Sequence, residues 1–268
     1  ITLNENVLDE KGDLNTADKV SFAEWMPIGL DQYTGTFDGQ GFTIKGMYIN
    51  GGENYTSGNV GLFGNINKGE VKNLFLTDGY ILINNKNNTN MYVGSICAKL
   101  TTTNAGINGI MTNCSSNIHI TMYTKANVAG GICGDTNAWF YRCSYTGTIE
   151  YKGSDNAMIG SIGGWVGNVW SDRTPAALFN YSYNTGKIIN TDKTYYVLFG
   201  RNAGLRNDSQ NEKNYYIEGD ENLPSSSKYA SRTAEQFSNG QVAYEMKNDY
   251  WGQTISGANR NECPVPHG

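Results

Sequence analysis

Aromatic, amide and charged residues that could bind a ligand recur together in the second half of the chain. Each group sets an indole or a guanidinium beside amide or carboxylate side chains: Asp135, Asn137 and Trp139; Trp170, Asp172 and Arg173; and Arg201 and Asn202. Aromatic rings stack on sugar faces or anchor protein partners, while Asn, Asp and Arg side chains hydrogen-bond hydroxyl groups. We therefore predict that these eight residues form a ligand-binding surface. The competing interpretation is that Trp139 and Trp170 fold over the protein's own edge.

Paired carboxylates are the second feature that could support chemistry. Glycoside hydrolysis needs two carboxyl groups about 5 to 9.5 Å apart, one of them protonated. The acids of the middle region are scattered over different phases of the repeat described below: Glu70, Asp78, Asp135, Glu150, Asp155 and Asp172. The Asn-Thr-Asp at 190–192 lacks the Asp-Asp and Gly-His-Gly that accompany it in pectin-hydrolysing enzymes. We therefore predict no catalytic residues.

Cysteine and histidine spacing predicts no metal site and no cofactor. The chain has five Cys and two His, without a C-x-x-C or H-E-x-x-H pattern. His119 alternates with Ile118 and Ile120 and is predicted to face solvent from a strand. Cys263 is predicted to be a surface thiol. The other four cysteines stand at equivalent points of a repeat, which predicts free buried thiols: Cys97, Cys114, Cys133 and Cys143.

Two short blocks recur along the chain with a period near 34 residues. The first reads VGLFG at 60–64, and its last residue recurs in steps of 34, 36, 33 and 33: Gly64, Ala98, Gly134, Gly167 and Gly200. The second block is anchored at five further positions: Leu74, Cys114, Cys143, Tyr181 and Tyr215. Both blocks are short runs of β-branched, aromatic or small residues, which indicates strands.

The repeat predicts an all-β chain, a right-handed parallel β-solenoid (β-helix) of about five coils. One strand-bearing coil cannot bury its own apolar face, whereas stacked coils can, with equivalent residues about 4.8 Å apart. We expect an N-terminal segment with the first strands over 1–50, the repeats over 51–220 and a capping segment over 221–268. Thr233 and Gln236 form a T-x-x-Q capping box, which predicts a short C-terminal helical cap. Asp38, in F-D-G-Q-G, is predicted to shape a turn.

Composition excludes several classes of protein. The 268 residues include 33 Gly and only 17% charged residues, and the formal net charge is −5. Without a Lys/Arg cluster the surface would repel a phosphate backbone, so nucleic acid is not an expected partner. No run approaches the roughly 18 apolar residues of a membrane span. We expect a monomer with no membrane span in this chain.

The stretch WMPIGLDQYTGTFDGQGFTIKGMYIN at 25–50, followed by the V-G-L-F-G and I-x-N-C blocks, resembles the GLUG-repeat proteins, named for a Gly-Leu-any-Gly motif. The resemblance covers about residues 25–220 and departs from the pattern at Ala98, where Gly is usual. The tail is similar to the closing segment of surface proteins of gut Bacteroidetes. Such repeats also accompany immunoglobulin A proteases. The resemblance implies an exported bacterial protein, extracellular or on the cell surface, of the adhesin type.

The expected function is a non-catalytic adhesion or ligand-binding module that recognises a glycan or a host or surface protein. Two alternatives stay open on the residues alone. One is a structural stalk that presents another domain. The other is a carbohydrate-active β-helix enzyme, a lyase or hydrolase, which would require carboxylates from neighbouring coils to converge in a cleft.

Overall fold

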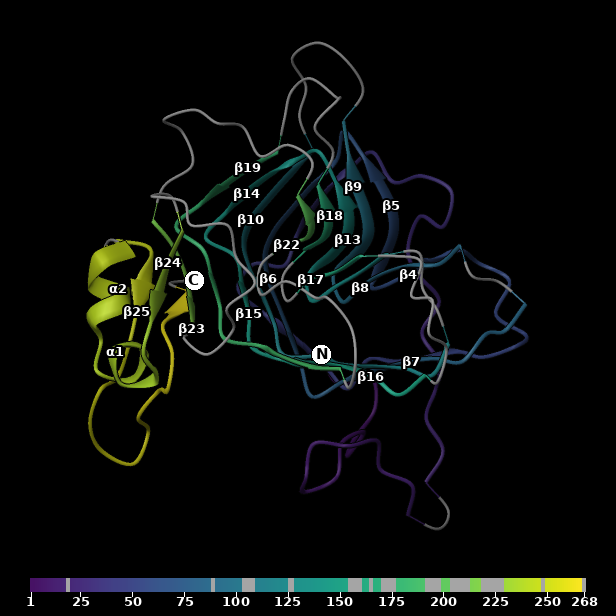
Figure 1. Ribbon diagram of the computed structural model, residues 1–268, viewed down its shortest axis with the longest axis horizontal. Helices are drawn as coiled ribbons and strands as arrows, with labels where there is room; N and C mark the ends of the chain where they lie inside the picture. Colours follow the sequence, from purple (N-terminus) through teal and green to yellow (C-terminus); the bar gives the residue numbers. More distant parts are fainter. Residues whose placement is uncertain are drawn as a thin grey trace.

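Short parallel strands are the main regular secondary structure of the described residues, as expected for an all-β chain (Figure 1). The computed structural model describes residues 1–17, 20–87, 90–102, 109–124, 128–153, 161–163, 166–169, 177–190, 199–202, 213–217, 229–246 and 249–266. Two short helices lie near the C-terminus, α1 (Ala234–Ser238) and α2 (Gln241–Met246). They stand to one side of the strands in Figure 1.

Three of the parallel sheets are built alike, from strands that follow one another in chain order. The first sheet contains β3 (Tyr48–Gly51), β7 (Tyr80–Ile83), β11 (His119–Met122), β16 (Thr148–Tyr151) and β21 (Lys187–Asn190). The second contains β4 (Asn59–Val60), β8 (Tyr92–Gly94), β12 (Val128–Gly130) and β17 (Ser161–Gly163). The third contains β5 (Phe63–Asn67), β9 (Cys97–Thr101), β13 (Cys133–Thr136), β18 (Val166–Val169) and β22 (Phe199–Asn202).

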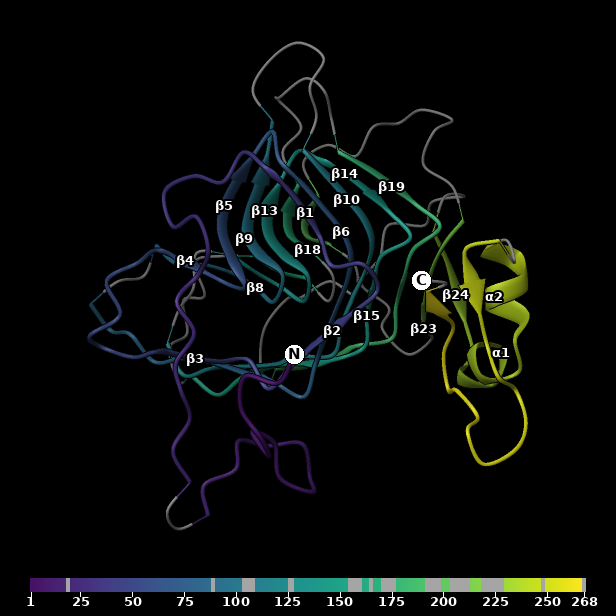
Figure 2. The same cartoon turned by 180° about the vertical axis from the view of Figure 1, so that it is seen from behind.

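A fourth sheet holds ten strands, and β1 and β2 lie beside β6 at one of its edges (Figure 2). Its members are β1 (Thr36–Asp38), β2 (Thr43–Lys45), β6 (Glu70–Thr77), β10 (Ile110–Ser116), β14 (Trp139–Tyr141), β15 (Ser144–Tyr145), β19 (Leu178–Asn180), β20 (Tyr183–Asn184), β23 (Asn214–Ile217) and β24 (Tyr229–Arg232). A small antiparallel pair joins β25 (Trp251–Gly252) to β26 (Val265–Pro266). We call each set of consecutive strands that visits the four parallel sheets a tier.

The first repeat block is in register from tier to tier, as predicted. Phe63 pairs with Cys97, and Cys97 pairs with Cys133. Val166 then pairs with both Cys133 and Phe199. The residues that follow, from Gly64 to Gly200, therefore stand opposite one another. Sequence positions about 34 apart touch across neighbouring tiers, which is the central expectation drawn from the repeat.

The second block is also in register, but two of its predicted anchors were displaced by one residue. Leu74 pairs with Cys114, and the Cys143 N–H donates to the Ser182 hydroxyl at 3.0 Å. Tyr183 pairs with Ser144 and with Tyr215. Ser182 rather than Tyr181 is therefore the equivalent of Cys143, and Asn214 rather than Tyr215 continues the series. Tyrosines and asparagines alternate in this part of the sequence, so residue type alone did not fix the register.

A residue with left-handed backbone precedes this position in five tiers. The φ angles lie between 51° and 56° at Asn73, Asn113, Arg142, Tyr181 and Lys213. Asn tolerates this region because its side chain is short and can hydrogen-bond locally. The Asn113 amide donates to Asn73 Oδ1 at 2.9 Å, and the Asn73 amide donates to Asp38 Oδ1 at 3.0 Å. Asp38 also accepts from the Gln40 N–H at 2.9 Å, so it shapes the predicted turn, and these hydrogen bonds hold its pKa below the ordinary value.

Lys213→Asn is expected to raise the free energy of unfolding by about 1 kcal/mol. A lysine gains nothing local in the left-handed region, whereas asparagine there is less strained. Urea unfolding followed by circular dichroism measures the effect. Lys187→Asn is the matched control: it places asparagine in the extended strand β21, where it should be neutral or slightly destabilising. Equal stability of the two variants would contradict the claim that asparagine relieves backbone strain at position 213.

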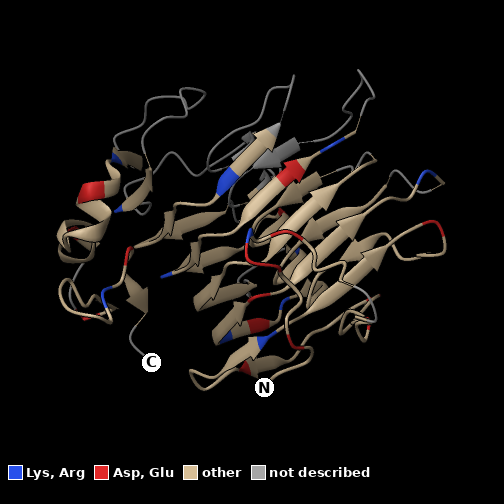
Figure 3. Ribbon diagram, turned by 90° about the horizontal axis from the view of Figure 1, so that it is seen from below, with Lys and Arg blue, Asp and Glu red and all other residues tan. Residues whose placement is uncertain are grey.

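Stacked apolar side chains fill the interior, and most of the strand ribbon carries no charge (Figure 3). Phe140 stacks on Phe179 with ring centroids 4.8 Å apart. The four repeat cysteines are free and buried, as predicted. Burial raises the pKa of the Cys97 and Cys114 thiols well above the ordinary value. Cys263 was wrongly predicted to be a surface thiol: it is partly buried 3.5 Å from the Thr185 hydroxyl, because the C-terminal segment folds back along β20.

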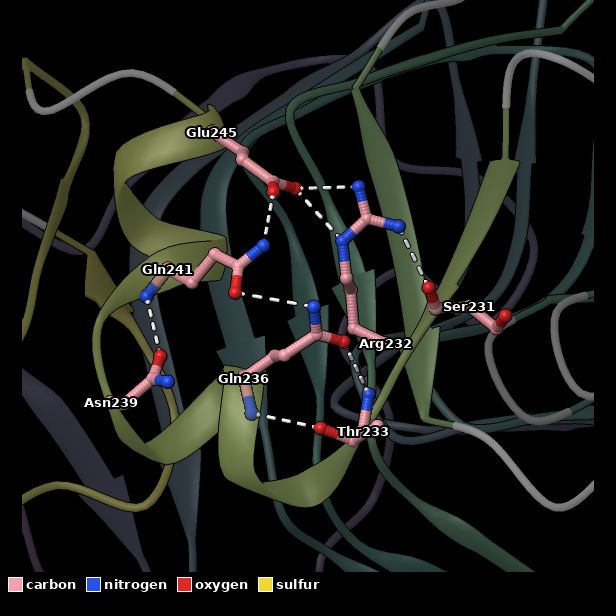
Figure 4. A network of polar contacts seen from close by, with 7 residues as sticks. All are labelled: Ser231, Arg232, Thr233, Gln236, Asn239, Gln241 and Glu245. Atoms are coloured by element: carbon pink, nitrogen blue, oxygen red, sulfur yellow. Dashed lines mark hydrogen bonds and ion pairs between the residues drawn. The ribbon is translucent and has the colours of Figure 1, made fainter.

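The two helices are tied to β24 by a polar network (Figure 4). Thr233 and Gln236 make the predicted capping box at the start of α1. Arg232 donates to Glu245 Oε2 through Nε at 2.9 Å and Nη2 at 2.7 Å, and the Gln241 amide donates to Oε1 at 2.8 Å. Burial alone would raise the pKa of Glu245, but the hydrogen bonds from Gln241 and Arg232 outweigh it and hold that pKa below the ordinary value.

Candidate functional site

A groove of about 690 Å³ lies between residues 24–31 and the loop at 50–59. Its lining is rich in groups that exchange hydrogen bonds with a polar ligand: the carboxylates of Glu24, Asp31 and Glu53, the amides of Asn50, Asn54 and Asn59, and the hydroxyls of Thr56 and Ser57. Met26, 58% exposed, adds an apolar surface. None of the described lining residues is a Lys or Arg, so the described lining carries negative charge.

One wall of the groove is fixed by the pairing of the N-terminal segment with β5. Ile28 forms a parallel bridge to Phe63, and its N–H donates to the Leu62 carbonyl at 2.9 Å. The Trp25 indole N–H donates to the same carbonyl at 3.1 Å. The segment therefore adds a partial tier beneath β5, and the side chains of Glu24 and Met26 are held at its edge.

The opposite wall is a short loop stabilised by its own tyrosine. The Tyr55 hydroxyl donates to the Asn59 carbonyl at 3.0 Å, and the Asn85 amide donates to the Tyr55 carbonyl at 2.8 Å. The Asn59 amide donates across to the Leu30 carbonyl at 3.0 Å, so the two walls are linked. Burial raises the pKa of Tyr55 to about 12, which keeps its hydroxyl neutral. A loop held this way presents Asn54 and Thr56 to solvent in a fixed arrangement.

Asp135, Asn137 and Trp139 are the sequence-predicted residues whose side chains the structure describes, and they do not line this groove. Asn137 is fully buried; its Oδ1 accepts from the Thr102 N–H at 2.9 Å and its Nδ2 donates to the Thr102 carbonyl at 3.1 Å. Asp135, in β13, is only 4% exposed. The Asn137 side chain therefore links neighbouring tiers and Asp135 is largely covered, and ligand contact by these two residues stays a prediction.

The rest of the predicted surface is described only in part. Trp139 is half-buried against Tyr141, with ring centroids 6.4 Å apart, and its indole nitrogen is buried without a hydrogen-bond partner among the described residues. Trp170, Asp172 and Arg173 lie outside the described residues. For Arg201 and Asn202 the structure gives the backbone alone, in β22, where they pair with Asn168 and Val169 of β18. The half-burial of Trp139 favours the interpretation that its ring covers the protein's own edge.

His119 was wrongly predicted to face solvent. It does point outward from β11, but the N-terminal loop at residues 9–13 covers it and leaves it 9% exposed. Its Nδ1 lies 2.7 Å from the carbonyl oxygen of Gly12, 107 residues away in the chain. No periodic signal in the sequence connects these two residues.

Sequence reasoning also missed the groove. Its two walls are about 25 residues apart in the chain, and they meet only because Ile28 pairs with Phe63. The loop GGENYTSGN at 51–59, rich in Gly, Asn and hydroxyl residues, was the available signal. Such a loop beside a regular repeat is typical of a binding element.

Comparisons of the chain with protein-family models, with curated proteins and with solved structures found no match. The resemblance to GLUG-repeat proteins therefore stays a prediction. No helix among the described residues is long and apolar enough to cross a membrane.

Proposed function

We propose that the chain is a right-handed parallel β-solenoid of about five coils with a short C-terminal helical cap, and that it is an exported or cell-surface module that binds a neutral glycan without catalysis. The observation that carries the binding proposal is the groove between residues 24–31 and 50–59. The tier-to-tier pairing of residues about 34 apart supports the architecture. The GLUG resemblance is the argument for display outside the cell.

The lining of the groove favours a sugar over other ligands. Amides, hydroxyls and carboxylates hydrogen-bond sugar hydroxyls, and the exposed Met26 side chain offers an apolar contact for a sugar ring. The described lining has three carboxylates and no lysine or arginine, so it would repel sialic or uronic acids, which points to a neutral glycan. The half-buried Trp139 makes the alternative surface a weaker candidate.

The test is binding of the purified chain to mucin and to an array of neutral and acidic glycans. Asn54→Ala combined with Thr56→Ala removes two exposed polar groups from the groove and is expected to weaken binding at least tenfold. Thr254→Ala combined with Asn259→Ala is the matched control, since it removes the same exposed side-chain types from the C-terminal segment. That variant should bind like the unaltered chain.

A further variant separates the groove from the surface that was predicted from the sequence. Trp139→Ala combined with Trp170→Ala should leave retention unchanged if the groove binds the glycan. Loss of retention in this variant alone would show that the surface around Trp139 and Trp170, and not the groove, binds the glycan. Absence of binding to every neutral glycan would favour the structural stalk.

A further inference from the structure

Three side chains of the kinds that bind metal ions converge where the N-terminal loop crosses the first sheet. Asp13 comes from that loop, His119 begins β11, and Glu150 lies on β16, the next strand of the sheet. One ligand atom from each lies within 4.8 Å of the other two. The register explains the proximity: Thr121 pairs with Glu150, so Glu150 lies on the neighbouring strand two residues beyond the position opposite His119, on the same face of the sheet.

The histidine ring is oriented as a metal ligand would be. A carbonyl oxygen only accepts hydrogen bonds, so at 2.7 Å from the Gly12 oxygen Nδ1 must carry the proton and donate. In the neutral ring Nε2 then keeps its lone pair. That atom is buried without a hydrogen-bond partner in the part of the chain that the structure describes, and it lies 3.9 Å from Glu150 Oε2. Metal-ligating histidines commonly donate their other nitrogen to a backbone carbonyl in this way.

The neighbouring groups leave Nε2 free for an ion. The Tyr80 ring lies 5.2 Å from the His119 ring, but its hydroxyl donates to Thr121 Oγ1 at 2.6 Å. Lys152 Nζ lies 2.8 Å from Glu150 Oε2 and competes for that carboxylate. The Lys152 side chain is 37% exposed, so it can turn into solvent when a second cation approaches.

We propose that Asp13, His119 and Glu150 bind one divalent transition-metal ion of the zinc type, which fastens the N-terminal loop to the sheet. One imidazole and two carboxylates, with water in the fourth position, are a donor set that Zn²⁺ accepts at about 2.0–2.2 Å. Tetrahedral ligand atoms at that bond length are about 3.3 Å apart, so the three groups must draw together slightly. The Asp13 side chain is exposed, so it is free to move toward the other two ligands.

The experiment is calorimetric titration of the metal-stripped full chain with ZnCl₂, with Co²⁺ absorption as a second readout. One ion per chain is expected. His119→Asn keeps a donor near Gly12 but removes the Nε2 ligand, and Asp13→Asn preserves shape at an exposed position. Each should weaken Zn²⁺ binding by about 100-fold or more while circular dichroism stays unchanged. Lys152→Met removes the competing cation and should tighten binding roughly fivefold.

Two controls exclude other sites. The chain has one further histidine, His267, and a partly buried thiol, Cys263, near its end. Cys263→Ser combined with His267→Ala should retain full Zn²⁺ affinity. Zn²⁺ should also slow tryptic cleavage after Lys11, which lies in the loop that the ion would hold. Loss of binding in the double variant, unaltered binding by His119→Asn, or the absence of a one-to-one complex would each overturn the proposal.

Discussion

Gly94→Ala is expected to lower the free energy of unfolding by about 3 kcal/mol or more, because an added methyl group has no space between the tiers. A Cβ at this position would collide with the Cys97 carbonyl oxygen and lie 2.7 Å from both Cys133 Cα and the Gly134 nitrogen. All three contacts are backbone atoms, which cannot move aside as the end of a flexible side chain can. Gly61 is the equivalent residue one tier earlier, and a Cβ there would collide with the Gly94 carbonyl oxygen, so the close approach repeats between tiers.

Gly52→Ala is the matched control for this prediction. The nearest atom to its Cβ would be the side-chain Oδ1 of Asn50 at 3.2 Å, and that amide can rotate. A change within about 0.5 kcal/mol is expected there. Urea unfolding monitored by circular dichroism compares the two variants. Equal midpoints would show that the tiers are not packed as closely at Gly94 as described.

Asn137→Ala is expected to cost about 3 kcal/mol of stability. It removes both hydrogen bonds to the Thr102 backbone, and each buried polar group deprived of its partner costs about 1–3 kcal/mol. The variant also separates a structural role from a binding role. If Asn137 serves the fold, the proposed glycan binding, measured well below the unfolding midpoint, should be unchanged.

Asn54→Ala is the control for Asn137→Ala, since Asn54 is an exposed asparagine in the groove loop. It should leave stability within about 0.5 kcal/mol of the unaltered chain. The opposite pattern, an unchanged midpoint for Asn137→Ala with loss of binding, would restore Asn137 to the ligand-binding surface.

The sequence predicted the tier-to-tier pairing of the first block because glycine is the residue that such close approach requires. Gly134 illustrates the constraint: a Cβ there would lie 2.6 Å from the Ala98 carbonyl oxygen. The series of small residues therefore marks the register directly. At Tyr181 and Tyr215 no such constraint applied, and neighbouring residues of similar type made a shift of one position invisible.

The candidate site was much less predictable than the fold. The repeat indicated which residues stack, but it did not distinguish outward side chains in solvent from those covered by another segment. Asn137 is of a residue type that often contacts ligands, yet its side chain hydrogen-bonds the Thr102 backbone of the adjacent tier. The groove and the cover over His119 both depend on where the N-terminal segment lies, and nothing periodic marks that segment.

The four stacked, reduced cysteines Cys97, Cys114, Cys133 and Cys143 determine how the protein would be lost in an oxidising medium. Thiol oxidation and exchange proceed through the thiolate, and burial keeps Cys97 and Cys114 protonated as long as the tiers stay closed. Once the chain opens, these sulfurs become reactive together and can be linked in non-native pairs. In an oxidising medium, opening becomes irreversible wherever oxidation outpaces reclosing, and the working lifetime is then set by the rate of opening.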